Sequence, residues 1–427
     1  MQKNHYVHLL KHRSFMALWG STTLLRLASN ILQFALAIYV LDLTGSAFVY
    51  STVLSIIILP RILCTSIAGY FADFEDSIRI LRWGTLGLTG LMACFFAIHT
   101  LVLPINIPLI YFLVICLELC ETFLAPAEGK ALLCIVEEEE LAPASKISSL
   151  DDGIVEILSP IIASLFYGYL GMTSVLGITL ILEGIAFALT FAIRSRVNAT
   201  PQNDEEVPKP QIFSLKNAFG AYREAIFDLK KHRYIIGIIL FAPLFNFFVS
   251  PLFSVAAPHY FLVTTKANLN MYTTFNIAMG IAGLIAPFIS MILINDKEEY
   301  RANKWGTVGC AMVLLCLTGI LCFGSNTIST NGMLYILTGA MSLVVAIITI
   351  MNIATSITIK KYIPEQIMGR VISMIQLCAT ISVPLGQLFY GLCTDKFSVI
   401  VSLLISVVGL MITFVVMIKT YKMIGGK

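Results

Sequence analysis

The chain is built from long apolar stretches separated by short polar breaks. Many of these stretches are long enough to cross a bilayer as helices, the form in which a segment satisfies its own backbone hydrogen bonds in lipid. They predict spans at residues 14–41, 46–71, 80–102, 107–128, 146–170 and 174–196, and then at 234–259, 267–294, 305–324, 332–355, 367–391 and 397–419. We therefore predict an all-α polytopic membrane protein with 12 transmembrane helices.

The longest polar interruption runs from Ser195 to Arg233, near the middle of the chain. It opens with Pro, Asn, Asp and Glu, a composition typical of a flexible linker. From Phe213 to Lys231, apolar residues recur at helical spacing between charges. That pattern fits either a helix at the membrane surface or a solvated helix packed on neighbouring loops. We predict an N-terminal six-helix half at 1–195, a cytoplasmic linker with an amphipathic helix at 196–233, and a C-terminal six-helix half at 234–427.

The two halves repeat short motifs in the same order. Lys11-His12-Arg13 precedes the first apolar stretch, and Lys231-His232-Arg233 precedes the first apolar stretch after the linker. Further along, Leu165-Phe166-Tyr167-Gly168 recurs as Leu388-Phe389-Tyr390-Gly391, and a proline precedes each copy. The separation along the chain is nearly the same for both motifs. Two such matches indicate an internal repeat, which is a common construction of transporters.

Composition supports the membrane class. Hydrophobic residues make up 58% of the chain and charged residues 12%, with a net charge of +3. A soluble globular protein carries about 25% charged residues, so that class is excluded. The 10 cysteines lie mostly inside apolar stretches and predict small buried side chains rather than disulfides. The first apolar stretch is long enough to span and stay, so we expect no cleaved signal peptide.

The sequence also lacks the common motifs of catalytic and cofactor sites. It contains no phosphate-binding glycine loop, no zinc-binding His-Glu-x-x-His helix and no Gly-x-Ser-x-Gly nucleophile turn. We therefore expect no enzymatic activity, no cofactor and no metal. His5, His8 and His12 have a spacing that can bind a metal, but an amphipathic lead-in to the first span is the preferred interpretation.

Positive charges are unevenly distributed along the chain. If both termini are cytoplasmic, all but four of the 28 Lys and Arg residues fall on the cytoplasmic side. The exceptions are Lys266 and Lys396 on the outside and Arg26 and Arg61 within spans. Cytoplasmic loops of membrane proteins are enriched in Lys and Arg, so we predict that both termini are cytoplasmic.

Several runs resemble the major facilitator superfamily and, within it, the drug-efflux branch that contains bacterial macrolide exporters. The first half carries Leu18-Trp19-Gly20, Gln33-Phe34-Ala35-Leu36 and Gly69-Tyr70-Phe71-Ala72-Asp73. Later runs are Ala125-Pro126-Ala127 with Val136-Glu137-Glu138, and Ile363-Pro364-Glu365 with Gly369-Arg370-Val371. The resemblance implies two six-helix halves around a central cavity, and transport by alternating access.

Two stretches depart from the pattern of the superfamily. In the family, the loop after the second helix carries Gly-x-x-x-Asp-Arg and latches the cytoplasmic ends of the two halves together. Here Gly69 and Asp73 match this gating loop, a phenylalanine replaces the arginine, and the first basic residue is Arg79. We expect a latch that is weaker or rebuilt with Arg79 and Arg82. In the fifth helix, Ser-Pro-Ile-Ile-Ala-Ser at 159–164 stands where antiporters carry a glycine-rich bend, which weakens the support for antiport.

Ionisable side chains are concentrated in the spans of the first half. Such groups are costly in a bilayer and are usually functional. Arg26, Asn30 and Gln33 share one helical face, and we expect this face to line the substrate pathway. Glu118 and Glu121 lie at a similar depth in the fourth span, and we predict that Arg26 pairs with one of them.

The carboxylates of the first half also suggest a proton relay. An acid at membrane depth can be protonated in one conformation and ionised in another, so alternating exposure can carry a proton inward while substrate moves outward. The alternative is a set of fixed ion pairs that hold the helices together. The candidates for proton coupling are Glu118, Glu121, Asp152, Glu156 and Glu183.

The spans of the second half carry no deep charges. Prolines and phenylalanines crowd the seventh span, which suits a large apolar substrate, although lipid-facing or core packing is the simpler explanation for most individual phenylalanines. Amide side chains in three spans can orient such a substrate. The predicted contacts of this half are Phe245, Asn246, Phe248, Asn276 and Gln376.

Together, these patterns predict a secondary active exporter of amphipathic drugs or antibiotics that works by alternating access and proton antiport. One alternative is a dedicated exporter of an endogenous product, such as a peptide antibiotic, a siderophore or a lysolipid. Another is a membrane scaffold or sensor that no longer transports. We expect a monomer in the bacterial cytoplasmic membrane whose partners are a small-molecule substrate, protons and membrane lipids, with no nucleic acid.

Overall fold

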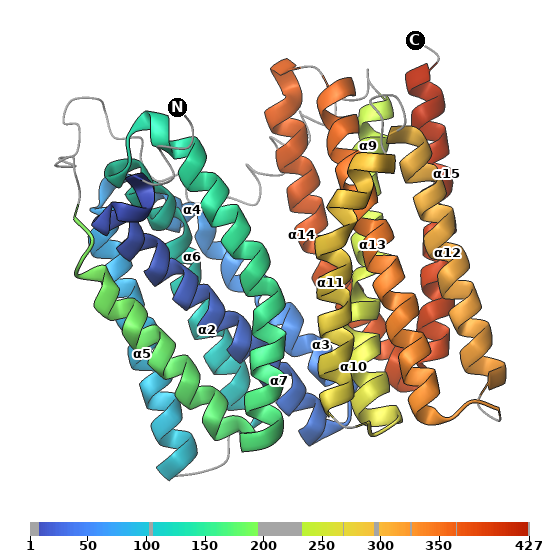
Figure 1. The fold of residues 1–427 in the computed structure, drawn as a ribbon, viewed down its shortest axis with the longest axis horizontal. Helices are drawn as coiled ribbons and strands as arrows, with labels where there is room; N and C mark the ends of the chain where they lie inside the picture. The colour runs from blue at the N-terminus through green and yellow to red at the C-terminus, as the bar shows by residue number, and fades with distance from the viewer. Residues whose placement is uncertain are drawn as a thin grey trace. The chain divides into compact units, whose positions relative to one another are not determined.

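A computed structural model describes residues 8–101, 106–194, 233–267, 269–293, 299–324, 327–363 and 365–425 of the chain. The regular elements among these residues are all helical (Figure 1). In the N-terminal part they are α2 (Arg13–Thr44), α3 (Ala47–Ile56), α4 (Ile58–Phe74), α5 (Ser77–Leu101), α6 (Ile107–Ile135) and α7 (Glu138–Thr190). In the C-terminal part they are α9 (Arg233–Phe248), the π-helical turn η1 (Leu252–Ala256), α10 (Ala257–His259), the π-helical turn η2 (Tyr260–Thr264), α11 (Leu269–Leu293), α12 (Glu299–Phe323), α13 (Thr330–Tyr362), α14 (Glu365–Lys396) and α15 (Val399–Gly425).

Among the described residues, 11 helical stretches are long and apolar enough to cross a membrane. The difference from the predicted number lies in α7, which carries both the fifth and the sixth predicted span. Gly171 interrupts α7 with a φ of 76°, a left-handed conformation that glycine adopts without steric cost. The hydroxyl of Ser174 donates to the carbonyls of Phe166 and Gly171 at 2.9 and 2.7 Å. Figure 1 accordingly shows α7 as two helical segments that meet at a bend. Because the regular elements of the described residues are all helical, the predicted all-α fold is confirmed.

The seventh predicted span is an irregular helix. From Arg233 to Thr264 it consists of α9, a short stretch at 249–251, and then η1, α10 and η2 in direct succession, so that η1 begins directly after Pro251. Proline lacks a backbone N–H and crowds the preceding turn, so a widened turn beside it relieves the helix without ending it. The predicted proline distortion of this span is therefore present as π-helical turns. The predicted linker at 196–233 lies outside the described residues, except for Arg233.

Two compact units divide the chain. The first comprises the described parts of residues 1–39 and 56–217, where α4 and α5 pack on α6 and α5 also packs on α7. The second comprises residues 40–55 and the described parts of 218–427, where α9 packs on α14 and α15, and α12 and α13 pack on each other. The second unit thus includes the end of α2 and nearly all of α3, which by sequence belong to the first half.

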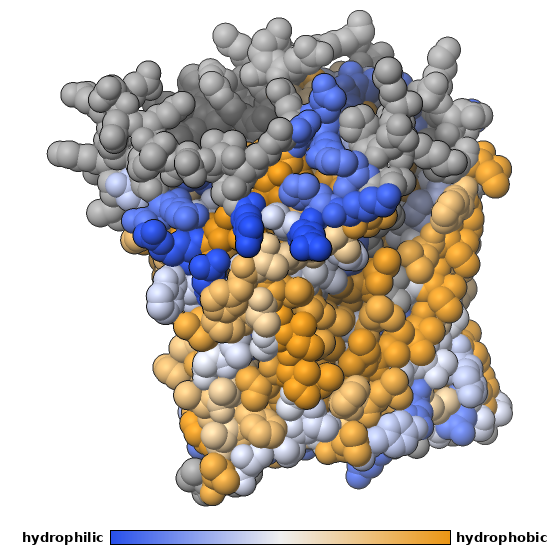
Figure 2. All heavy atoms as spheres, turned by 60° about the vertical axis from the view of Figure 1, so that its left-hand side comes forward, coloured by the Kyte–Doolittle hydropathy of each residue, from blue (hydrophilic) through white to orange (hydrophobic). Residues whose placement is uncertain are grey.

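The surface has the character that lipid requires. On the face in Figure 2, apolar side chains form a broad band, and hydrophilic side chains gather above it. Many large apolar side chains are exposed, among them Leu101, Phe288 and Ile292, which are 82%, 69% and 81% exposed. In water such a surface would promote association, whereas in a bilayer it is matched to its surroundings.

A further repeated motif is found where helices pack closely within each of the two units. Arg82-Trp83-Gly84 in α5 has a counterpart in Lys304-Trp305-Gly306 in α12, at nearly the same separation as the other repeated motifs. Each glycine lies where the next helix approaches closely. A Cβ at Gly84 would lie 2.6 Å from the side chain of Leu124 in α6, and one at Gly306 would lie 2.5 Å from Met351 in α13. The two units therefore share this glycine contact between adjacent helices.

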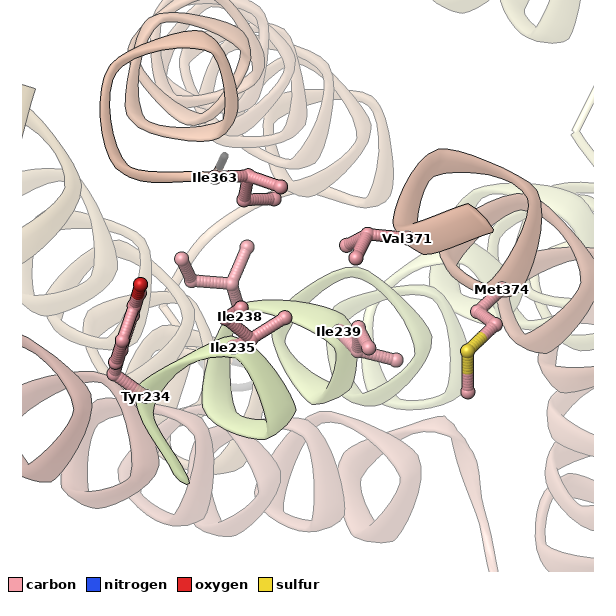
Figure 3. Close-up of a cluster of buried hydrophobic side chains, with 7 residues drawn as sticks. All are labelled: Tyr234, Ile235, Ile238, Ile239, Ile363, Val371 and Met374. Carbon is pink, nitrogen blue, oxygen red and sulfur yellow. The ribbon is translucent and has the colours of Figure 1, made fainter. Parts of the chain in front are cut away.

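A small apolar core holds the start of α9. Tyr234, Ile235, Ile238 and Ile239 pack against Ile363, Val371 and Met374, which lie at the end of α13 and in α14 (Figure 3). The hydroxyl of Tyr234 also donates to the carbonyl of Tyr362 at 3.2 Å. The first turns of α9 are thereby anchored inside the second unit.

Candidate functional site

The first unit contains a partly open cavity of about 450 Å³. This volume falls within the range of roughly 300–1,000 Å³ that is usual for small-molecule sites. Side chains from α2, α4, α5, α6 and α7 line it. Among the described residues, its charged lining residues are Arg26, Arg61, Glu118, Glu121, Glu128 and Glu183.

Helical periodicity explains why these side chains converge. On α2, Thr22, Arg26, Ser29 and Asn30 line the cavity at intervals of three and four residues, which places them on one face. On α6, Glu118, Glu121, Thr122, Ala125 and Glu128 follow the same rule. Arg26 and Asn30 of the predicted α2 face therefore reach the cavity. The third member, Gln33, donates to the hydroxyl of Ser29 at 3.4 Å and is not among the lining residues.

Two ion pairs join helices that line the cavity. Arg61 of α4 donates from Nε and Nη2 to Oε1 of Glu118 at 2.8 and 2.7 Å. Arg26 of α2 pairs with Glu128 of α6. The predicted pairing of Arg26 with Glu118 or Glu121 is therefore corrected, because Glu118 is held by Arg61 and the carboxylate bonded to Arg26 lies further along α6.

Glu128 was not among the predicted site residues. It stands seven residues after Glu121, which is two helical turns, so both lie on the same face of α6. The predicted fourth span ends at residue 128, so Glu128 stands at its boundary. In the structure α6 continues to Ile135, which places Glu128 well inside it.

The remaining acids of the cavity have few partners. Glu121 accepts a hydrogen bond from the hydroxyl of Ser29. Glu183 is 3% exposed, and its Oε2 has no hydrogen-bond partner among the described residues. The Oε2 atom of Glu118 is in the same situation, although its Oε1 binds Arg61. Burying an acceptor without a donor is costly, so these atoms mark a place where a proton or a ligand can bind.

Three further acids of α7 lie outside this constellation or outside the description, and two of them, Asp152 and Glu156, were predicted to couple protons. Asp151 accepts a hydrogen bond of 2.6 Å from the hydroxyl of Thr23 and is buried. Asp152 and Glu156 belong to α7, but their side chains are not among those that the structure describes. Their predicted part in proton coupling stays a prediction.

A cation from α6 binds the end of α4 and the loop that follows it. Lys130 of α6 donates from Nζ to the carbonyls of Ala72 and Glu75 at 2.6 and 3.3 Å. A cation at the C-terminal end of a helix satisfies free carbonyls and complements the helix dipole. Arg79 is exposed, and Arg82 binds the carbonyl of Thr190 at 3.4 Å. The cation that binds the end of α4 is therefore Lys130, and the predicted latch with Arg79 and Arg82 stays a prediction.

The residues in and near the predicted gating loop lie in different surroundings. Gly69 lines the cavity, and nothing lies within 4 Å of the position that a Cβ would take there. Asp73 is part of α4, but its side chain is not among the described ones. Asp76 accepts from the backbone N–H of Ile78 at 2.9 Å and so caps the start of α5.

The predicted contacts of the second half are not among the lining residues of this cavity. Phe248 packs on Gly409 of α15 so closely that a Cβ there would lie 2.1 Å from its ring. Phe245 is buried beside Phe241, with 6.2 Å between ring centroids. Asn276 donates to the carbonyl of Tyr272 in its own helix at 2.8 Å. For these residues the structure favours packing within the second unit.

Two other predicted residues of the second half are polar and differ in their exposure. Asn246 is half-buried in α9, and Gln376 is exposed on α14. Near the N-terminus, Nδ1 of His8 lies 2.6 Å from Oε1 of Glu140 at the start of α7. No group of three or more His, Cys, Asp and Glu among the described residues is arranged to hold a metal ion. His5 lies outside the described residues.

Comparisons with known proteins agree with this architecture. The sequence profile of the Major Facilitator Superfamily matches residues 18–387. The chain is 23% identical over 377 residues to YkuC of Bacillus subtilis, described as an uncharacterized MFS-type transporter, across 86% of this chain and 82% of the relative. It is 21% identical over 394 residues to macrolide efflux protein A of Streptococcus pyogenes, across 90% of each chain.

Solved structures with the same fold are transporters. A bacterial homologue of the iron transporter ferroportin in its inward-facing state matches with a TM-score of 0.70 and 16% identity, over 95% of this chain and 98% of the other. A peptide transporter of the POT family matches with a TM-score of 0.69 and 10% identity, over 96% of this chain and 94% of the other. At these identities the likeness concerns the fold alone.

Proposed function

Because the chain belongs to the Major Facilitator Superfamily, we propose that it is a secondary active exporter of amphipathic drugs or antibiotics, driven by proton antiport. The chain is a multi-pass protein of the bacterial cell membrane and a membrane transporter rather than an enzyme. The proposal adds a direction, a class of cargo and a driving ion to that statement. It also places both termini in the cytoplasm. This orientation puts most Lys and Arg residues on the cytoplasmic side of the membrane, as is usual in membrane proteins.

The observation that carries the proposal is the state of Glu183. This acid is 3% exposed, lines the cavity, and has one oxygen without a hydrogen-bond partner among the described residues. An ionised carboxylate in such a position is costly, so Glu183 favours any state in which it holds a proton or a positively charged group. A group that must exchange its proton as its surroundings change is what a proton-driven carrier requires.

Glu121 extends this site. It lines the same cavity and lies close enough to Glu183 for the two carboxyl groups to interact electrostatically. Two neighbouring acids resist being ionised together, because like charges repel in a medium that screens them poorly. In the proposed cycle, a proton bound from outside is released when the cavity opens to the cytoplasm, and cargo then binds to the ionised site.

The ion-paired acids have a different role in this proposal. Glu118 and Glu128 are each held by an arginine from a neighbouring helix. Such pairs fix α2 and α4 against α6, which is the alternative that the sequence left open for the whole set of charges. We assign that structural role to Glu118 and Glu128, and proton exchange to Glu183 and Glu121.

The proposed cargo rests on two further observations. Apolar side chains, including those of Leu25, Leu88 and Leu124, cover much of the cavity wall, which suits a compound with a large apolar body. The likeness to macrolide efflux protein A over 90% of the chain supports export of such compounds.

The test is accumulation of labelled compounds in cells with and without the protein. The panel contains a macrolide and a cationic dye, each measured with and without a protonophore. We expect the protein to lower accumulation, the protonophore to abolish that effect, and E183Q to abolish it in the same way. E139Q serves as the control, because Glu139 is an exposed acid in the first turn of the same helix.

Two results would contradict the proposal. If E183Q exports as well as the unmodified protein and stays sensitive to the protonophore, Glu183 is not the coupling site. If no compound differs between cells with and without the protein, general drug efflux is excluded. A dedicated endogenous cargo or a role without transport then becomes the better explanation.

A further inference from the structure

The start of α12 and the end of α15 meet within the second unit. The two helices lie side by side (Figure 1). The ring centroids of Tyr300 in α12 and Tyr421 in α15 are 4.6 Å apart, and the side chain of Asn303 donates to the hydroxyl of Tyr421 at 3.2 Å. These contacts hold the two helix ends together, so the side chains that point outward from both ends share one stretch of surface.

This surface is positively charged. The charged side chains that the structure describes on α12 and α15 are Glu299, Arg301, Lys304, Lys419 and Lys422. The acid is buried and accepts hydrogen bonds from Lys361 and Tyr362 of α13 at 2.6 and 3.0 Å. Lys304 is half-buried and the other three cations are exposed. The outward charge on the described part of these two helix ends is therefore carried by the cations.

An aromatic side chain and an apolar surface adjoin the cations. Nζ of Lys304 lies 5.4 Å from the ring centroid of Trp305, which is itself exposed. Met312 on α12 and Met411 on α15 are also exposed. Lys304 and Met312 are separated by eight residues, which is about 12 Å along a helix. Cations beside an interfacial tryptophan, followed by exposed apolar side chains, match a lipid with an acidic head group and acyl chains.

The matching position in the first repeat is arranged differently. Arg82, the counterpart of Lys304, donates to the carbonyl of Thr190 at 3.4 Å and lies 4.9 Å from the ring centroid of Phe191. Its charge therefore serves the end of α7 and an aromatic ring of the same unit. The first repeat thus provides an internal comparison, in which a basic residue also precedes an exposed tryptophan but is bound within the protein.

We propose that the surface formed by Arg301, Lys304, Trp305, Lys419 and Lys422 binds the head group of an anionic phospholipid. The phosphate lies among the cations of α12 and α15, and the acyl chains follow the apolar faces of the same helices. Lys and Arg side chains bind phosphate through charged N–H donors, and each one near a membrane surface adds to the attraction of anionic lipid. A zwitterionic lipid carries its own cation beside the phosphate and gains less from this surface. The proposal goes beyond the export function, because it depends neither on the cargo nor on the driving ion.

The experiment measures which lipid surrounds each tryptophan. W19F/W83F retains Trp305 as the single tryptophan, and W19F/W305F retains Trp83. Each purified full-length protein is reconstituted in phosphatidylcholine with a rising share of a lipid brominated near its head group, either phosphatidylglycerol or phosphatidylcholine. We expect the anionic lipid to quench Trp305 with an apparent affinity at least about threefold higher than that of the zwitterionic lipid. At Trp83 the two lipids should quench nearly equally.

Charge variants identify the residues that select the lipid. K304Q and K422Q each remove one cation, one from each helix, and should lower the preference at Trp305. K304Q/K422Q should bring that preference close to the value at Trp83, whereas K304R keeps the charge and should retain it. K396Q is the matched control, because Lys396 is an exposed cation that precedes the opposite end of α15. High salt should reduce the preference, since mobile ions screen exposed charges. Thermal melting of each variant checks that it remains folded.

Three results would overturn the proposal. The first is equal quenching of Trp305 by the anionic and the zwitterionic lipid. The second is an unchanged preference in K304Q/K422Q. The third is the same preference at Trp83 as at Trp305, which would indicate a general enrichment of anionic lipid around the protein rather than a site. The assay involves no transport, so a failure of the export function would leave its result unaffected.

Discussion

The carboxylate of Asp395, near the end of α14, accepts a hydrogen bond of 2.6 Å from the backbone N–H of Ala47, the first residue of α3. Its other oxygen accepts from the hydroxyl of Ser46 at 2.5 Å and from the N–H of Phe48 at 3.0 Å. The first N–H groups of a helix have no partner within the helix, and an acid there also complements the helix dipole. Asp395 therefore caps α3 from a helix at the opposite end of the sequence.

Removing this cap should weaken the start of α3. We expect D395A to lower the free energy of unfolding by about 0.5–2 kcal/mol, the usual value of an N-terminal cap. Hydrogen exchange should become faster at the amides of Ala47 and Phe48, because both lose their acceptor. The free energy of unfolding of D395N should lie between those of D395A and the unmodified protein, because the oxygen of an amide side chain still accepts a hydrogen bond. The exposed neighbour Lys396 provides the control K396A, and equal exchange in D395A and K396A would disprove the capping role.

Lys130 should stabilise the end of α4 by its charge. K130M removes the donor to the carbonyls of Ala72 and Glu75 and should reduce stability by about 0.3–1 kcal/mol, the range for a cation at a helix C-terminus. K130R should restore part of the loss. Thermal melting in detergent measures the effect. R79M is the matched control, because Arg79 is an exposed cation near the same loop. A larger loss of stability in R79M than in K130M would show that Arg79, and not Lys130, stabilises this part of the protein.

The repeated glycine contact gives a test by steric size. A side chain at Gly84 meets Leu124, whereas nothing lies within 4 Å of a Cβ at Gly87 in the same helix. G84L should destabilise the protein by about 1–3 kcal/mol through overpacking, and G87L should be tolerated. The same contrast is expected in α12 between G306L and G319L, because Gly306 meets Met351 and Gly319 has open space. Similar melting temperatures within either pair would contradict the close approach.

Trp83 and Trp305 should report the depth of the membrane surface. They are 66% and 64% exposed and occupy matching positions in the two repeats, each directly after a basic residue. Tryptophan is enriched at membrane–water interfaces. With three tryptophans in the chain, variants that retain one at a time are straightforward to make. Both residues should be quenched more strongly by lipids brominated near the head group than by lipids brominated deep in the chain. Stronger deep quenching would place these helix positions inside the hydrocarbon layer.

Much of the architecture follows from local sequence patterns. The length of each apolar stretch determines whether it can span, and this depends on contiguous residues alone. The periodicity of helices explains why the shared face of Arg26 and Asn30 was predictable and why both line the cavity. Repetition of Lys-His-Arg and Leu-Phe-Tyr-Gly likewise indicated two related halves before any contact was known. The bend at Gly171 explains why two predicted spans share one helical element.

Side-chain partnerships depended on the tertiary structure. Arg26 pairs with Glu128 rather than with Glu118 or Glu121, and Lys130 of α6 binds the end of α4. The packing of the first unit was also needed to show that one carboxylate oxygen of Glu183 has no hydrogen-bond partner among the described residues. The physical reason is one of scale. One helical turn rises about 5.4 Å, while a hydrogen bond tolerates only a few tenths of an ångström. A helix that slides by a single turn exchanges every partner on its face, and the apolar pattern that places it in the membrane is unchanged.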